Sequence, residues 1–301
     1  MKNTQKSLKR VYLTDTQCKN IVYVILLAAS IARLFAPDCL ADDCLRYFAY
    51  STGALWTPEL LPMAMLSLGF WVVKVIQVAC PIVFSLGLWL LLHGKVSDKV
   101  LVFGIALVNF LPAFNLFWMV LLKNGLMISF LPYFVKYLLE GKNRLALIFL
   151  ILMGLSHLTF ALLAAPMLFM SKSKKLRIAG LAFVIIMAAY YLGNQSYIVG
   201  KVGGTNFNYL FVDFLLVAFA AMSKKTPLKW MFLFVAFASV GSLLMVEAWR
   251  VFITLNIAAL IPAMAYLDSR KERVFDYLML GYALVAAAQF VFYITSLTPY
   301  V

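Results

Sequence analysis

The sequence predicts an all-α, polytopic integral membrane protein: a helical bundle of about 9–11 transmembrane helices that forms a single domain over residues 1–301. Three observations support this fold class. Of the 301 residues, 64% are hydrophobic and only 13% are charged, whereas a soluble protein is roughly half apolar and a quarter charged. The mean hydropathy is +0.94. Apolar runs long enough to cross about 30 Å of hydrocarbon recur along the chain, separated by short basic loops.

The apolar runs give roughly ten expected spans, each close to the length that crosses a bilayer. The first run follows a tail that contains five basic residues, Lys2 to Lys19, and it lacks a small-residue cleavage site. We therefore expect an uncleaved signal anchor whose N-terminus lies in the cytoplasm. The expected spans are 21–35, 63–92, 100–122, 125–139, 145–170, 178–193, 209–222, 230–246, 251–267 and 275–296.

Charge divides the connecting loops into two sets. The basic set comprises 93–99, 140–144, 171–177, 223–229 and 268–273, and the positive-inside rule predicts that it is cytoplasmic. The other set is acidic, amide-rich or aromatic, and it is expected to face outward. It comprises 37–62, the 123–124 turn, 194–208, the 247–250 turn and the C-terminal tail. Topology and anionic lipid thus explain the net charge of +14, and nucleic acid is not an expected partner.

The charge rule conflicts with a plain span at one place. The loops 140–144 and 171–177 are both expected in the cytoplasm, yet only one apolar run, 145–170, lies between them. Either a strongly basic loop is exported, or the run forms a re-entrant hairpin. In the second case two halves of about 12 residues are hinged near Ser156–His157, and His157 stands at the tip inside the membrane.

The motifs of soluble enzymes are not found in the sequence. There is no phosphate-cradling glycine-rich loop, no nucleophile elbow and no histidine-rich metal cluster. We expect neither a cofactor nor a resident metal, although Asp42–Asp43 has the chemistry to hold a divalent ion. Cys39 and Cys44 share one outward loop, where they either form a disulfide or remain two free thiols.

Polar side chains that flank the expected spans gather on the outward side. Such groups are costly in lipid and tend to be functional. Cations, carboxylates, amides and aromatic rings together suit the binding of a carbohydrate or a diphosphate. The group comprises Arg33, Asp38, Asp42, Asp43, Arg46, Tyr47, Tyr50, Lys123, Asn124, Asn194, Gln195, Lys201, Asn206, Asn208, Asp213, Glu247 and Arg250, with Asn109 and Asn115 somewhat deeper.

Several of these side chains also have ordinary structural explanations. Arg33 and Lys123 can snorkel to the interface, and for either residue alone this is the favoured interpretation. Glu247 and Arg250 have i,i+3 spacing, so a local ion pair would satisfy both. A lone histidine such as His157 is more often a packing residue than a catalyst. The functional interpretation therefore depends on the joint pattern, in which Arg250, Glu247 and His157 are the catalytic candidates.

Several short motifs resemble the EpsG family, which is related to Wzy-type O-antigen polymerases. They are Leu122-Lys-Asn-Gly-Leu-Met-Ile-Ser129, the Leu-Leu-Glu-Gly-Lys142 loop, and Ser-His-Leu-Thr-Phe160. Glu247-Ala-Trp-Arg-Val-Phe252 is similar to a Glu- and Arg-containing span of that family, and Asp-Asp-Cys-Leu-Arg-Tyr47 is similar to its entry loop. The order of the blocks covers most of the chain. Lys123 and Asn124 stand where the family usually has Arg and Gln, and lysine offers a point charge rather than a bidentate fork.

The resemblance implies an enzyme that joins oligosaccharide repeat units carried on undecaprenyl diphosphate, at the outer face of a bacterial inner membrane. It implies that Arg250, with Lys123 or Arg46, stabilises the departing diphosphate, and that Glu247, Asp43 or His157 takes the acceptor proton. The remaining substrate-binding candidates are Asn124, Tyr47, Lys201, Asn206 and Asp213.

The expected partners are the undecaprenyl-diphosphate-linked glycan, membrane lipid and a chain-length regulator protein. A transporter or flippase of a lipid-linked sugar, or of a small polar solute, is the alternative function. Two observations favour the enzyme: the two halves of the chain show no repeat, and the polar side chains are one-sided.

Overall fold

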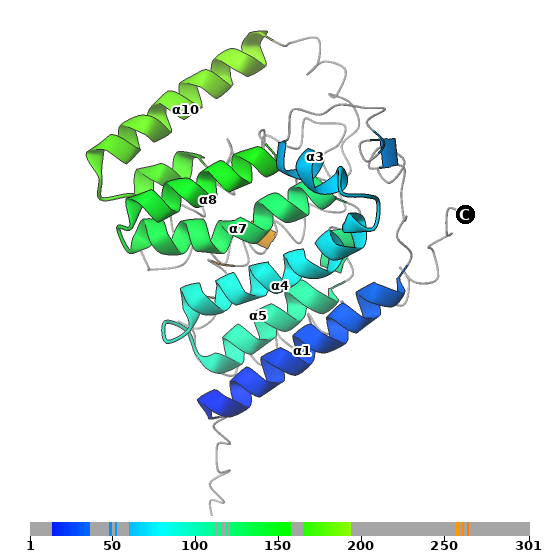
Figure 1. Ribbon diagram of the computed structural model, residues 1–301. Helices are drawn as coiled ribbons and strands as arrows, with labels where there is room; N and C mark the ends of the chain where they lie inside the picture. Colours follow the sequence, from blue (N-terminus) through cyan, green and yellow to red (C-terminus); the bar gives the residue numbers. More distant parts are fainter. Residues whose placement is uncertain are drawn as a thin grey trace, which may run out of the picture.

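The computed structural model describes residues 14–36, 48–49, 52, 60–111, 114–115, 118–119, 121–157, 165–193, 257–258, 261 and 264. Within these residues all regular secondary structure is helical, which confirms the all-α class for this part of the chain. The helices are α1 Asp15–Phe35, α3 Leu60–Leu66, α4 Val72–Leu92, α5 Asp98–Phe110, α7 Leu122–Leu139, α8 Asn143–Ser156, the 3-10 helix η1 Ala165–Met170 and α10 Lys174–Gly193 (Figure 1).

Two of the described helices, α1 and α4, are long and apolar enough to cross a membrane, as judged by length and composition. Helix α1 begins with a capping box, in which the Thr14 hydroxyl accepts from the Gln17 backbone N–H and the Gln17 side chain accepts from the Thr14 backbone N–H. Its buried residues recur every three or four positions, which is one helix face turned toward the bundle. They are Cys18, Val22, Leu26, Ala29 and Arg33.

Helix α4 packs closely against α7 at the centre of the bundle. At Gly87 an added Cβ would lie 2.7 Å from the ring of Tyr133 and 2.9 Å from Pro132, so only glycine permits this approach. Phe84 and Trp118 are fully buried beside this contact, with ring centroids 5.8 Å apart. The same Tyr133 ring also stacks on Phe149 of α8, with ring centroids 5.1 Å apart. The core is therefore built on α4 and α7, with the other helices around them.

Two expected spans are shorter in the structure. The run 63–92 is divided, because α3 ends at Leu66 and α4 begins at Val72. Gly69 lies between them with φ +123°, a left-handed backbone that ends the helix. In the run 100–122, helix α5 ends at Phe110, before Pro112, and the described residues 114–115 and 118–119 are again helical. The expected spans 209–222, 230–246 and 275–296 lie outside the described residues.

The helix ends with basic loops lie on one side of the bundle. In Figure 1 the start of α1, the α4–α5 turn, the α7–α8 turn and the start of α10 all lie on the left. We call this side the basic end, defined by loops 93–99, 140–144 and 171–177. The end of α1, the starts of α4 and α7 and the end of α8 lie on the right, at the opposite end. In the described part of the chain, the three basic loops therefore lie at the same end of the bundle.

The segment 145–170 is interrupted at the position where the re-entrant alternative places its hinge. Helix α8 ends at Ser156, and His157 at its C-cap is extended, with φ −158° and ψ 98°. Fourteen residues reach only about 21 Å at 1.5 Å per residue, which is less than the thickness of a bilayer core. Helix α8 begins at the basic end, and α10 begins there as well (Figure 1).

Candidate functional site

A buried arginine lies at the opposite end of the bundle from the basic loops. Arg33 is in the last turn of α1, and it is only 2% exposed. Its Nη1 donates to Asn109 Oδ1 at 3.2 Å. Its Nη2 donates to the Asn109 backbone carbonyl at 2.9 Å and to Asn115 Oδ1 at 2.8 Å. The guanidinium therefore joins α1 to the C-terminal end of α5 and to the residues that follow it.

The amide of Asn109 is itself fixed in orientation. Its Nδ2 donates to Ser85 Oγ of α4 and to the Ile105 carbonyl of its own helix, both at 2.9 Å. Ser85 Oγ in turn donates to the Pro81 carbonyl at 2.6 Å. With both amide hydrogens engaged in this way, the Oδ1 atom of Asn109 is directed at Arg33. The guanidinium is thus held by a network that spans three helices.

The positive charge of Arg33 is not neutralised within the described part of the chain. All three of its hydrogen-bond acceptors are neutral oxygens, and the third guanidinium nitrogen, Nε, is buried without an acceptor. Among the described residues Arg33 forms no ion pair with a carboxylate. A buried charge without a counter-charge is costly. Packing alone therefore does not explain why an arginine occupies this position.

A second cation, Lys74, binds the backbone at the end of α1. Lys74, in the first turn of α4, donates from Nζ to the Ala36 carbonyl at 2.7 Å and to the Arg33 carbonyl at 3.2 Å. A cation at the C-terminal end of a helix satisfies its open carbonyls and complements its dipole. We call Arg33, Lys74, Ser85, Asn109 and Asn115 the Arg33 cluster.

No family model matches the chain. No curated protein matches it either. The resemblance to the EpsG family therefore rests on the short sequence motifs alone.

The candidates from the sequence that fall within the described residues lie on two helices. Lys123 and Asn124 are in the first turn of α7, with Lys123 half-buried and Asn124 buried. His157 is half-buried at the C-cap of α8. All three positions belong to helix ends on the same side of the bundle as the Arg33 cluster (Figure 1). The other candidates lie outside the described residues: Arg250, Glu247, Asp43, Arg46, Tyr47, Lys201, Asn206 and Asp213.

The structure corrects one interpretation and adds one residue. The favoured sequence interpretation, that Arg33 snorkels to the interface, is wrong, because the side chain is buried among α1, α4 and α5. Lys74 was missed, since it lies within the apolar run 63–92. A charge inside an apolar run is the signal that would have found it. Cys18 and Cys80 are buried free thiols, while Cys39 and Cys44 lie outside the described residues.

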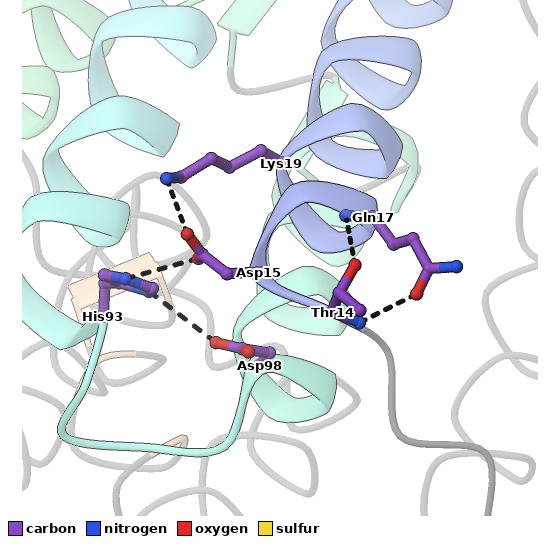
Figure 2. A network of polar contacts seen from close by, with 6 residues as sticks. All are labelled: Thr14, Asp15, Gln17, Lys19, His93 and Asp98. Carbon is purple, nitrogen blue, oxygen red and sulfur yellow. Dashed lines mark hydrogen bonds and ion pairs between the residues drawn. The ribbon is translucent and has the colours of Figure 1, made fainter.

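A separate polar network anchors α1 at the basic end (Figure 2). Asp15 pairs with Lys19 at 2.7 Å, and its other oxygen lies 3.5 Å from His93 Nε2. His93 Nδ1 lies 3.6 Å from Asp98, and the imidazole stacks on Trp89 at 4.6 Å between ring centroids. These contacts tie the start of α1 to the α4–α5 turn. Nothing in them points to a reaction, and they explain how α1 is positioned along α5.

The α7–α8 turn carries a second surface network. Glu140 pairs with Lys136, and with Lys142 at 2.9 Å. The hydrogen bond from Lys136, followed by that from Lys142, lowers the pKa of Glu140 to about 2. Gly141 has φ +73°, which allows the chain to turn directly into α8. This network shapes the turn at the basic end, far along α7 from Asn124.

Proposed function

We propose that this chain is an integral membrane glycosyltransferase. It would join undecaprenyl-diphosphate-linked oligosaccharide repeat units into O-antigen or exopolysaccharide at the outer face of the bacterial inner membrane. The observation that carries the proposal is the Arg33 cluster, a buried cation held by amides inside an apolar helical bundle. Such a group fits a substrate that is lipid-borne and anionic.

The apolar surface of the described helices supports a membrane location. On α1 the outer face exposes Tyr23, Leu27 and Phe35 by 63%, 62% and 87%. Ile151 of α8 and Ile185 of α10 are likewise exposed by 59% each. Soluble monomers rarely expose contiguous apolar patches beyond a few hundred Å². In the proposal these faces contact lipid, and the chain forms a polytopic bundle of about 9–11 helices.

The charged ends give the proposed orientation. The basic end would lie in the cytoplasm together with the N-terminus, and the opposite end would face the periplasm or the exterior. In this orientation the segment 145–170 enters from the cytoplasm and returns there. His157 then stands at the inner tip of a re-entrant hairpin, in protein rather than in lipid, as interrupted backbone at membrane depth requires.

The proposed reaction needs no nucleotide, because the donor already carries a good leaving group. A hydroxyl oxygen of the acceptor sugar attacks the anomeric carbon of the donor chain. A carbon–oxygen bond forms, the bond to the diphosphate breaks, and the lipid diphosphate departs with its electron pair. Arg250, with Lys123 or Arg46, would stabilise the developing charge, and Glu247, Asp43 or His157 would take the hydroxyl proton. Tyr47, Asn124, Lys201, Asn206 and Asp213 would bind sugars.

A genetic experiment tests the proposal. Deletion of the gene in its host should collapse the ladder of surface polysaccharide on a gel to single-repeat bands, and the intact gene should restore it. The variant Arg250→Ala should fail to restore the ladder although the protein is present in the membrane. A ladder that is unchanged after the deletion would remove polymerisation from consideration.

A transporter of lipid-linked sugars is the second candidate, and one observation favours it. Helix α8 stops at Ser156, partway across a bilayer, and interrupted helices are frequent at the binding sites of transporters. The two functions are separated by reconstitution in liposomes with a lipid-linked repeat unit on the outer leaflet only. An enzyme lengthens the glycan, whereas a transporter moves it inward with its length unchanged.

A further inference from the structure

We propose that Gln77 is a positioning residue, which holds the connection between α5 and α7 in place and thereby fixes the first turn of α7, where Lys123 lies. This inference rests on the proposed function, because only there is Lys123 assigned to the departing diphosphate. Gln77 itself lies in the apolar run 63–92 and belongs to none of the sequence motifs.

The first turn of α7 has no side-chain cap of its own. Its N-cap residue, Leu121, makes no side-chain hydrogen bond, whereas α1 begins with the capping box of Thr14 and Gln17. The first backbone N–H groups of a helix have no acceptor within the helix, and a capping side chain is the usual means of holding that turn. The position of the first turn of α7 therefore depends on the residues that precede it.

Gln77 binds the connection close to the start of α7. The side chain is fully buried, and its Nε2 donates to the Met119 backbone carbonyl at 2.9 Å. A polar side chain inside an apolar run is costly, and such residues tend to serve a site. Because Lys123 follows Met119 by four positions, this bond fixes the backbone close to Lys123.

Two further contacts hold the same connection. Arg33 Nη2 donates to Asn115 Oδ1 at 2.8 Å. Trp118 donates from Nε1 to the Val108 carbonyl at 3.0 Å, and a Cβ added to Gly125 would lie 3.5 Å from the Trp118 ring. The indole therefore lies against the beginning of α7 while it is bonded to α5. Together with the bond from α4, these contacts tie the connection to three helices.

A second bond of the same kind joins α4 and α7 further from Lys123. The Tyr133 hydroxyl donates to the Val83 carbonyl at 3.0 Å. Tyr133 lies ten positions after Lys123, in the second half of α7. Both this bond and that of Gln77 join a side chain to a backbone carbonyl and are similar in length, so they should contribute similarly to stability. A difference between their effects on the reaction would therefore report position.

The experiment measures polymerisation by the full-length protein in liposomes, with an undecaprenyl-diphosphate-linked repeat unit as substrate and rates expressed per folded protein. Gln77→Met keeps the length of the side chain and removes the donor. A displacement of about 1 Å can cost about 100-fold in rate, and loss of a contact made only in the transition state lowers kcat. We expect kcat to fall by about tenfold or more while KM stays within about twofold. Tyr133→Phe, the matched control, should retain the kcat of the wild type.

A double-mutant cycle shows whether Gln77 acts through Lys123. Lys123→Gln removes the charge and should lower kcat by itself. In that background Gln77→Met should cost about twofold or less, because residues that act through one contact are not additive. A purely structural glutamine would instead lower kcat by the same factor in both backgrounds. That result would overturn the inference, as would a wild-type kcat in Gln77→Met or in Lys123→Gln.

Hydrogen exchange in lipid nanodiscs tests the positioning without the reaction. Gln77→Met should speed exchange of the backbone amides 121–125 and leave that of 133–139 unchanged, because the loosened segment is local. Tyr133→Phe should leave exchange of 121–125 as in the wild type. Unchanged exchange of 121–125 in Gln77→Met would overturn the inference. Faster exchange there, with a wild-type protein that leaves repeat units single, would confirm the hold on α7 and refute the proposed function alone.

Discussion

The role of Asn109 can be tested by truncating its side chain. In Asn109→Ala the guanidinium of Arg33 loses its bond to Oδ1 at 3.2 Å, and the bonds from Nδ2 to Ser85 and to the Ile105 carbonyl are lost as well. The backbone carbonyl of residue 109 still accepts from Nη2. The variant thus removes the part of the network that orients the arginine and leaves one contact in place.

The magnitude follows from the type of bond that is lost. A hydrogen bond to a charged group contributes about 1.5–3 kcal/mol, and a neutral interhelical bond in a membrane contributes about 0.6 kcal/mol. We therefore expect Asn109→Ala to destabilise the protein by about 3 kcal/mol. Ser85→Ala, which removes a neutral acceptor from the same amide, should cost about 1 kcal/mol.

The assay is equilibrium unfolding in detergent, combined with a double-mutant cycle between Arg33→Met and Asn109→Ala. If the amide holds the guanidinium, the cost of Asn109→Ala should fall markedly once Arg33 is replaced, because residues that share a bond are not additive. Purely additive effects, or a cost of Asn109→Ala below about 0.5 kcal/mol, would contradict the proposed network.

Three further predictions concern the helix contacts and the topology. Gly87→Ala should destabilise the protein by about 1–3 kcal/mol, because its Cβ would lie 2.7 Å from Tyr133; Gly125→Ala, whose Cβ would meet Trp118 at 3.5 Å, should be tolerated in the same unfolding assay. The stabilisation from Glu140 should be present above pH 4.5 and lost as the pH falls toward 2, because folding lowers the pKa of Glu140 from 4.5 to about 2. Unfolding measured across this pH range should show that Glu140→Gln lacks this pH-dependent component. A variant with the same pH dependence of stability as the wild type would contradict the ion pairs. Topology can be tested by cysteine labelling after the four native cysteines are replaced by serine. A membrane-impermeant thiol reagent applied outside cells should label Thr52→Cys and should not label Ser173→Cys. Labelling of both variants would contradict the assigned cytoplasmic position of loop 171–177.

The helical class is predictable because the apolar composition and the recurring long apolar runs together indicate it. A chain with 64% hydrophobic and 13% charged residues has few alternatives. The conflict between two basic loops left two alternatives for the run 145–170, a plain span or a hairpin hinged near Ser156–His157. The structure places the helix end at Ser156. These features depend on local sequence and on charge summed over loops, and both can be read from a single chain.

The Arg33 cluster was less accessible to sequence reasoning. An arginine near the end of an apolar run can extend to the interface or fold back into the bundle, and local sequence does not distinguish the two. The outcome depends on Asn109 and Asn115, which lie 76 and 82 positions further along the chain. Lys74 was hidden for a different reason. A hydropathy average over a long window does not show the helix break at Gly69. This break is what places Lys74 in the first turn of α4.

The most direct test of the central claim is polymerisation by the purified protein. The protein is reconstituted in liposomes with an undecaprenyl-diphosphate-linked repeat unit as the sole glycan, and the products are separated by length. The account predicts glycans of several repeats together with stoichiometric release of undecaprenyl diphosphate, both strongly reduced in Arg33→Gln and Arg250→Ala. Repeat units that remain single in the presence of the folded wild-type protein would contradict it.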